Sequence, residues 1–335
     1  MGHAHGVKPP IDPVRWRPPP IEPLPDFGAL ADLTVVPVPG SAPEDVVVDA
    51  DGQLWTGVDD GRILRISPGD GAATVVANTG GRPLGLAVAG DGRLLICDSP
   101  RGLLALDPAT GTLETLVDSV GGRHLQFTSN VTELPDGTIY FTESTSTLTY
   151  VHFRGAVLEA RARGSLFRRD PDGTVATVAG GLYFANGVTP TLDGTALVFA
   201  ETMGRRISKY WLAGPRADSV TPLAVHLPGY PDNLSTGADG RIWTAMVTSV
   251  NKIAEWLSPR APFVRKAAWL LPERVLAAMA PSVWAVAFDP DTGAAVAGVR
   301  GSHPAFSLVT GVAELDGHLW MGSIGAPAIA HCPLP

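Results

Sequence analysis

The sequence is poor in cysteine and has no excess of basic charge. Its only two cysteines, Cys97 and Cys332, lie far apart and outside any CxxC pair. This spacing excludes a disulfide framework as the organising feature; two buried free thiols are the expected state, with a bridge as the alternative. The formal net charge is −8. An acidic chain lacks the basic surface that nucleic-acid binding requires, so we expect no nucleic-acid partner.

Long apolar runs are missing as well. No stretch approaches the roughly 20 apolar residues that a transmembrane helix needs. The segment from Met1 to Phe27 is polar and rich in proline, without the hydrophobic core of a secretory signal. We therefore expect a cytoplasmic protein with a Pro-rich tail over residues 1–28 and a single domain over residues 29–335.

Glycine and proline are abundant, with 38 and 31 residues, and glycine recurs in the turns of an internal repeat. A hydrophobic strand, an Asp-Gly pair and a second hydrophobic strand occur six times. The pairs are Asp51-Gly52, Asp91-Gly92, Asp136-Gly137, Asp193-Gly194, Asp239-Gly240 and Asp316-Gly317. Asp-Gly between two such runs is a strong hairpin signal, because a tight turn requires positive φ.

Most of these hairpins are followed by two more strands, which gives units of roughly 40 residues, the size of a propeller blade. The sequence therefore predicts an all-β, six-bladed β-propeller. Two units carry insertions, at about residues 144–163 and 250–282. The second contains NKIAEWLS, PFVRKAAWLL and PERVLAAMA, which predicts a helical hairpin in blade five. That hairpin could pack on the ring, cover the site as a lid, or rest on a membrane.

The last unit ends at Pro335 after about three strands, whereas the strand-like segment Leu33 to Val38 has no blade of its own. We expect this segment to complete blade six and to close the ring, which removes the exposed edges that an open sheet would leave.

Polar residues recur where the first strand of each blade should line the central channel. Seven residues before the turn aspartate lie Glu44, Leu84, Asn186 and Asp232, in blades one, two, four and five. In blades three and six, Asn130 and Thr310 lie six residues before it, and Asn233 follows Asp232. A closed ring directs these side chains toward one axis.

Two carboxylates and two or three amide oxygens form an oxygen-only set with no His or Cys. Such a set suits calcium better than magnesium or zinc. The sequence therefore predicts Ca²⁺ as a cofactor, with Glu44, Asn130, Asn186, Asp232 and Asn233 as candidate ligands. The alternative is that these residues cap the channel and bind ordered water. The acids at the ends of the second strands, Asp59, Asp98, Glu143 and Glu201, are expected at a larger radius, as solvated side chains or proton acceptors.

Three stretches carry a resemblance to a known superfamily: PEDVVVDADGQLWTG, LYFANGVTPTLDGTALVFAET and LPGYPDNLSTGADGRIWTA. The chain resembles the SMP-30/gluconolactonase and paraoxonase-like superfamily, and the YFANG and GYPDN strings resemble its strictosidine synthase-like branch. This resemblance implies a six-bladed propeller with calcium on the channel axis. In calcium-binding members the ligands fall on the positions of Glu44, Asn130, Asn186 and Asp232, with Asn233 adjoining.

The chain also departs from these relatives. Strictosidine synthase uses a glutamate at the start of its last blade, where this chain has Thr310 or a neighbour. Paraoxonases place a histidine on the inner strand of blade two, where this chain has Leu84. His124 is the one nearby imidazole that could substitute for it.

The predicted function is a calcium-dependent hydrolase of lactones or esters, with Asp232 or Glu44 as the proton acceptor and His124 as a further candidate base. The expected partner is a small-molecule lactone or ester. Two alternatives remain open. One is a non-catalytic, calcium-stabilised propeller that serves as a binding module, with peripheral membrane contact through residues 250–282. The other, less favoured, is a condensing enzyme similar to strictosidine synthase.

Overall fold

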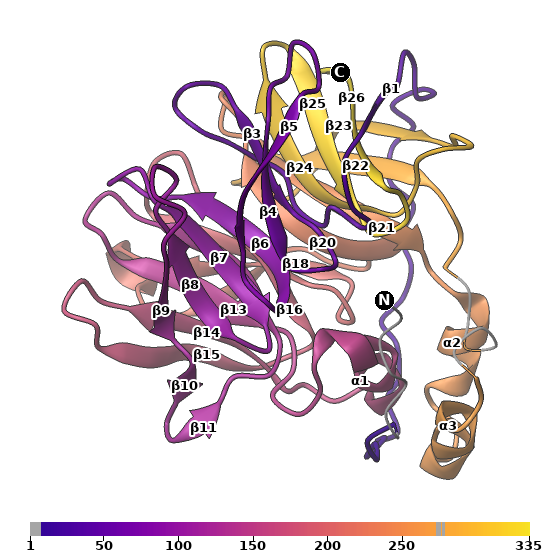
Figure 1. The fold of residues 1–335 in the computed structure, drawn as a ribbon. Coiled ribbons are helices and arrows are strands. Elements are labelled where there is room, and N and C mark those ends of the chain that lie inside the picture. Colours follow the sequence, from indigo (N-terminus) through magenta and orange to yellow (C-terminus); the bar gives the residue numbers. More distant parts are fainter. Residues whose placement is uncertain (1–7, 273–275, 277–278) are drawn as a thin grey trace.

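The computed structural model of the chain describes residues 8–272, 276 and 279–335. Six four-stranded antiparallel sheets stand around a central axis, and the first strands of neighbouring blades contact one another in a closed ring (Figure 1). The predicted six-bladed β-propeller is confirmed.

The blades use consecutive strands, ordered from the channel outward. Blade one has β2 (Val47–Val48), β3 (Leu54–Gly57), β4 (Arg62–Ile66) and β5 (Ala73–Asn78). Blade two has β6 (Arg82–Val88), β7 (Leu94–Ser99), β8 (Gly102–Leu106) and β9 (Leu113–Val117). Blade three has β12 (Thr128–Glu133), β13 (Ile139–Glu143), β14 (Gly164–Arg169) and β15 (Val175–Leu182).

Blades four to six continue the pattern. Blade four has β16 (Ala185–Pro190), β17 (Ala196–Glu201), β18 (Arg206–Trp211) and β19 (Val220–Ala224). Blade five has β20 (Gly229–Thr236), β21 (Ile242–Ser249), β22 (Val283–Phe288) and β23 (Ala295–Gly301). Blade six has β24 (Val309–Leu315), β25 (His318–Ser323), β26 (Ala328–Pro333) and, outermost, β1 (Thr34–Pro37). A small ribbon of β10 (Ser119–Val120) and β11 (Arg123–His124) precedes blade three.

The Asp-Gly turns form because glycine accepts a left-handed backbone. The glycine of each of the six pairs has a positive φ, between 68° at Gly194 and 88° at Gly240. In blade six the preceding Asp316 also has φ of 48°, and Leu315 pairs directly with His318. This two-residue turn is tighter than the turns of the other five blades.

The N-terminal strand closes the ring. β1 pairs with β26 in antiparallel register, from Thr34 opposite His331 to Pro37 opposite Ala328. The predicted closure of blade six is thus confirmed. The two cysteines are free and buried, as expected.

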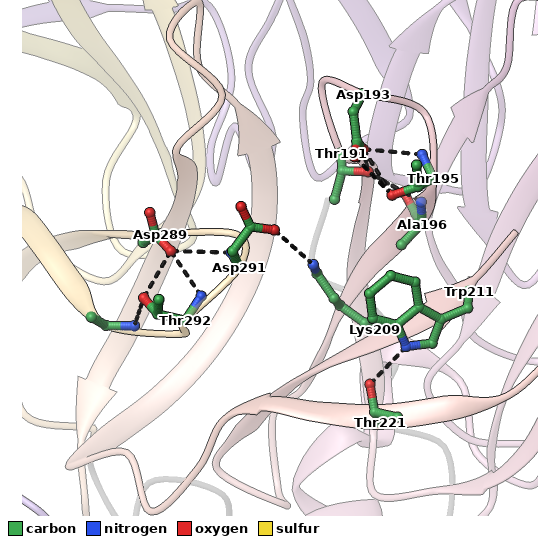
Figure 2. A network of polar contacts seen from close by, with 11 residues as sticks. Thr191, Asp193, Thr195, Ala196, Lys209, Trp211, Thr221, Asp289, Asp291 and Thr292 are labelled. Carbon is green, nitrogen blue, oxygen red and sulfur yellow. Dashed lines mark hydrogen bonds and ion pairs between the residues drawn. The ribbon is translucent and has the colours of Figure 1, made fainter. Parts of the chain in front are cut away.

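Neighbouring blades also meet at their outer loops. Lys209 on β18 of blade four reaches Asp291, between β22 and β23 of blade five, at 3.8 Å (Figure 2). Its ammonium lies over the Trp211 ring, 4.7 Å from the centroid. The aliphatic stem of this lysine is therefore buried while its charge is paired at the rim.

Helices occur in both predicted insertions. The first holds the short 3₁₀ helix η1 (Tyr150–His152) and α1 (Phe153–Glu159), and the second holds α2 (Lys252–Leu257) and α3 (Pro262–Trp269). A second 3₁₀ helix, η2 (Gly214–Arg216), joins β18 to β19. The helical hairpin in blade five is confirmed; the expected PERVLAAMA helix falls partly on residues 273–275 and 277–278, outside the described residues. None of the helices described is long and apolar enough to cross a bilayer.

The segment from residue 8 to residue 22, which we call the N-terminal strap, runs between these helices (Figure 1). The Lys8 ammonium donates to the Leu271 carbonyl at 2.7 Å, and the Trp269 indole donates to the Pro9 carbonyl at 2.7 Å. The backbone N–H of Val14 donates to the Glu159 carbonyl of α1 at 3.0 Å. Residues 8–22 therefore join α1 to α3, a role that the expectation of a simple tail did not include.

Candidate functional site

A cavity of about 240 Å³ opens at the end of the channel where both helical insertions lie. Its walls are mainly apolar and come from four blades and both insertions. They include Phe127, Tyr150, Phe153, Phe184, Met203 and Tyr230. Its floor is polar and comes from the beginnings of the inner strands.

β-Bulges position the floor residues. In blades two to six the ladder between the first and second strands skips two residues, as between Thr128 and Val131 or between Ala185 and Val188. A bulge re-aims side chains near a strand end. One residue from each blade lines the cavity: Glu44, Leu84, Ser129, Asn186, Asp232 and Thr310. We call these six residues the floor ring.

The residues that follow form a second ring, in which Asx and glycine alternate. Its members are Asp45, Gly85, Asn130, Gly187, Asn233 and Gly311. A Cβ on Gly85 would lie 2.4 Å from the Asn130 Nδ2, and one on Gly311 would lie 2.5 Å from the Asp45 Oδ1. Each of these two glycines therefore leaves room for the polar side chain of the next blade.

Asn130 belongs to this second ring, and the sequence count placed it wrongly in the first. That count allowed a one-residue shift in blades three and six. The shift is correct only in blade six, because only the two-residue Asp316-Gly317 turn shortens the hairpin. Blade three follows the general count of seven, which gives Ser129. Asp45 was missed altogether, and the alternation of Asx with glycine is the signal that would have found it.

Every polar hydrogen of the floor is already directed to an acceptor within the protein. The Thr310 hydroxyl donates to the Glu44 carbonyl at 2.5 Å, and the Thr202 hydroxyl donates to the Pro231 carbonyl at 2.7 Å. Ser129 contacts Ser144 at 2.7 Å. Because the Ser144 hydroxyl donates to the Ala185 carbonyl at 2.7 Å, Ser129 must be the donor in that pair.

The amide groups are oriented in the same way. Asn186 donates to Asp232 and, at 3.2 Å, to Thr202, and Asn233 donates to Glu44 at 3.2 Å. The Oδ1 atoms of Asn186 and Asn233 are buried without a hydrogen-bond partner. With its carboxyls ionised, the floor thus offers acceptors only. A buried set of unpaired acceptors is costly unless a cation or an outside donor joins it.

Among the described residues, no Lys or Arg side chain forms an ion pair with the carboxyls of the two rings. Burial, followed by the charges of Asp232 and Asp45, raises the pKa of Glu44 well above its usual value. Burial and then Asp45 raise the pKa of Asp232 to about 8, and burial raises the pKa of Asp45 to about 7. The Arg82 guanidinium lowers the Glu44 pKa only in part. Adjacent buried carboxyls cannot all ionise unless positive charge arrives.

These observations fit a hard divalent cation, which prefers oxygen ligands. Within the described part of the chain, no cluster of three or more His, Cys, Asp or Glu side chains is spaced for a metal. A cation at the floor would therefore depend on amide oxygens as much as on Glu44 and Asp232. Asn130 is less suited to contact it, since its Oδ1 accepts the Val188 N–H at 3.2 Å and its Nδ2 donates to Asp45 at 3.3 Å.

His124 is not brought to the cavity. It lies on β11 as an exposed residue, and its Nε2 is 3.1 Å from the Pro100 carbonyl oxygen. The reason is that the β10–β11 ribbon stands ahead of blade three rather than in the channel. We therefore withdraw His124 as a candidate base at this cavity.

The acids at the ends of the second strands have a structural role. Asp98, Glu143 and Glu201 are fully buried, so the expectation of solvated side chains was wrong for these three; Asp59 is exposed. Each buried acid accepts a backbone N–H from the segment that enters or begins its blade: Arg82 at 3.1 Å, Gln126 at 2.9 Å and Tyr183 at 2.9 Å. Glu143 and Glu201 are further paired with Arg123 and Arg206.

Both insertions help to enclose the cavity. Tyr150, Phe153 and Val157 come from the first insertion, and Val250, Asn251 and Met279 from the second. α1 contacts α3, and Ile11 of the strap packs with Leu148 and Trp269 in one buried cluster. The insertion of blade five therefore forms part of the cavity wall.

Comparison with known proteins gives a consistent assignment. The family profile described as SMP-30/gluconolactonase/LRE-like region matches residues 42–258. The protein strictosidine synthase-like 4 of Arabidopsis thaliana is 33% identical over 292 residues, which are 84% of this chain and 76% of that protein. A solved gluconolactonase of Xanthomonas campestris superposes with a TM-score of 0.66 at 20% identity, covering 99% of each chain.

A calcium-binding protein, regucalcin, of Agrobacterium tumefaciens superposes with a TM-score of 0.60 at 17% identity, over 88% of this chain and 90% of that one. At such identities these two structures support the fold alone. The profile match and the plant relative support more: the chain belongs to the SMP-30/gluconolactonase/LRE-like family and is similar within it to strictosidine synthase-like proteins.

Proposed function

We propose that the protein is a calcium-dependent hydrolase of lactones or esters. The observation that carries this proposal is the floor of the cavity, where Glu44, Asp232 and the unpaired Asn186 Oδ1 face a mainly apolar space. Membership of a family named for gluconolactonases, and a fold shared with a calcium-binding regucalcin, support it.

Glu44, Asn186 and Asp232 would hold the ion, and Asn233, which donates to Glu44 and has an unpaired Oδ1, would be a further candidate ligand. Asn130 would act from the second ring, where it orients Asp45. A bound Ca²⁺ would supply Lewis-acid polarisation of a substrate carbonyl and stabilise the negative charge that develops on its oxygen.

The other roles belong to the chain itself. The Asp232 carboxylate would accept a proton from the attacking water and pass it to the departing alkoxide oxygen. Phe127, Phe184 and Tyr150 form a wall of edge-packed rings, with centroids 5.4 Å apart for Phe127 and Phe184. This wall favours a substrate with an apolar acyl or ring group. A carboxylate beside a cation is a weak base, so we expect slow turnover on unactivated esters.

The test is hydrolysis of a lactone panel by the wild-type protein in millimolar calcium and after chelation. We expect activity that is lost with the chelator, restored by calcium, and absent in Asp232→Asn. Two results would overturn the proposal. One is a folded protein that hydrolyses no lactone or ester, and the other is a rate of hydrolysis that the chelator does not change.

A second candidate is a calcium-stabilised propeller that binds a small molecule without turnover. The observation that favours it is the floor ring itself, in which Leu84 and Thr310 occupy two of the six positions and, among described residues, neither His nor Lys lines the cavity. Saturable binding without product would support this reading. A condensing enzyme is least favoured, since the Thr310 hydroxyl is committed to the Glu44 carbonyl.

A further inference from the structure

Large exposed apolar side chains gather in the insertion of blade five. Ile253, Trp256, Phe263, Leu270 and Leu271 have 67%, 58%, 72%, 81% and 45% of their surface exposed. We call these five residues the apolar face. The other exposed large apolar side chains of the described residues are spread over segments far apart in the sequence, such as Val75, Leu192 and Val296. Single exposed residues are ordinary, but five within one short segment indicate an interaction surface.

Helix geometry separates an anchored side from an open side. On α3, Arg265 and Trp269 are buried: Arg265 donates to the Leu158 carbonyl at 2.8 Å, and Trp269 donates to the strap. Phe263 and Leu270 are seven residues apart, two turns along the helix, and share another side. On α2, Ile253 and Trp256 are three residues apart and are likewise neighbours. α3 is therefore fixed to the molecule while its aromatic and aliphatic side stays open.

The charge around this face is opposite to that of the whole protein. In the sequence, residues 250–271 contain four basic residues against a single acid, Glu255, in a chain of net charge −8. Of these basic residues, Arg260 and Lys266 lie outside the buried, anchored side. The adjoining strap adds Lys8, Arg15 and Arg17 against Asp12 and Glu22. The Arg260 guanidinium lies 3.4 Å from the centroid of the Trp256 ring, so basic and apolar groups occur together.

We propose that the apolar face docks on the surface of an anionic phospholipid bilayer. Trp, Phe and Leu side chains bordered by Arg and Lys are what an interfacial helix needs: the rings enter the headgroup boundary and the cations meet lipid phosphates. The local excess of positive charge selects an anionic surface over a neutral one and over a second copy of this acidic chain. The same insertion also lines the cavity, through Val250, Asn251 and Met279, so docking would hold the cavity near the lipid.

The experiment is co-sedimentation with vesicles of phosphatidylcholine, with and without phosphatidylserine, in the presence of a calcium chelator. Chelation removes calcium bridging and separates this test from the proposed hydrolysis. We expect binding to the phosphatidylserine vesicles that falls about tenfold or more in Phe263→Glu/Leu270→Glu and weakens with salt. The matched control Leu192→Glu places the same charge at a residue of 67% exposure far from the insertion, and should bind as wild type.

Melting curves of all variants establish that each is folded. If the double variant unfolds, Arg260→Gln/Lys266→Gln replaces it and should lose the preference for phosphatidylserine. The proposal is overturned if the wild-type protein does not bind phosphatidylserine vesicles, or if Phe263→Glu/Leu270→Glu binds them equally well. It is also overturned if the wild-type protein is a dimer in solution and this double variant is a monomer.

Discussion

At the scale of single residues, Asp45 is the acid that joins the first three blades. Its Oδ1 accepts the Val46 N–H at 2.9 Å, and its Oδ2 accepts the Leu86 N–H at 3.0 Å and the Asn130 Nδ2 at 3.3 Å. These donors offset part of the cost of burying a carboxyl. Asp45 therefore acts as a support for the floor ring.

Asn130→Ala should destabilise the fold more than it changes the cavity. The substitution removes a donor from Asp45 and leaves the buried Val188 N–H without its acceptor, which costs about 1–3 kcal/mol per unsatisfied group. Chemical denaturation should report this loss in the free energy of unfolding. Ser129→Ala is the matched comparison: it should cost less stability, because it removes only the hydrogen bond to the Ser144 hydroxyl. A reversed order would contradict the supporting role of Asn130 in the second ring.

The raised pKa values predict a pH dependence with a definite sign. Asp232 has a pKa of about 8 in the folded, ion-free protein against 3.8 as the reference. Between these values the unfolded chain has lost a proton that the folded chain keeps, so the stability of the ion-free protein falls as pH rises from about 4 to about 8. Calcium binding needs the ionised carboxylates, so affinity should rise over the same interval.

Thermal melts near pH 6 and pH 8, with and without calcium, measure this effect. The gain in melting temperature from calcium should be larger at the higher pH, and smaller at both in Asp232→Asn. If the increase in melting temperature caused by calcium is independent of pH, the buried carboxyls do not titrate in this range.

The sequence was informative for those residues whose environment is set by local geometry. Glu44, Asn186 and Asp232 line the cavity because their distance from the Asp-Gly turn fixes their place on the inner strand. Asn130 was misplaced because the one-residue shift that the short turn of blade six requires does not apply to blade three. The burial of Glu143 and Glu201 depends on Arg123 and Arg206 and on distant backbone N–H groups, which spacing alone does not reveal.

At the scale of elements, the strap is the feature that the sequence concealed. Its proline-rich stretch has neither helical nor strand periodicity, so it looked like a tail. In the structure, Arg205 and Arg265 donate from buried positions to the Pro19 and Val14 carbonyls of the strap. The strap thus supplies one carbonyl acceptor to each of two buried guanidinium groups.

Deletion of residues 1–22 should leave the propeller folded, because β1 is retained, while it loosens α1 and α3. Hydrogen exchange should rise by about tenfold or more in these helices and stay unchanged in the inner strands of the blades. Arg265→Met in the full chain is a narrower version of the same change. Unchanged exchange in α1 and α3 after the deletion would show that the strap does not hold them.

Deletion of residues 1–38 removes β1 as well and should be far more harmful. It exposes the edge of β26 along its pairing from Ala328 to His331. An open edge of this kind promotes aggregation. Light scattering of the two truncated proteins makes the comparison, and equal solubility would count against closure by β1.

At the scale of the whole molecule, the ring of blades and the helical insertions form different parts of the cavity. Inner strands from all six blades supply the floor, and the blades together with both insertions supply mainly apolar walls. The cavity and the apolar face share the insertion of blade five. A substrate that partitions into lipid would therefore meet the cavity from the docked side.

The central claim is that the floor binds one calcium ion, and calorimetric titration of calcium into chelator-treated protein tests it most directly. We predict one site per chain, weakened by about tenfold or more in Glu44→Gln and in Asp232→Asn, which each remove a carboxylate ligand. Asp291→Asn, which removes an outer-loop carboxyl that is 88% exposed, should bind as wild type. Folded wild-type protein that takes up no calcium at millimolar concentration, or undiminished binding in both floor variants, would contradict the account.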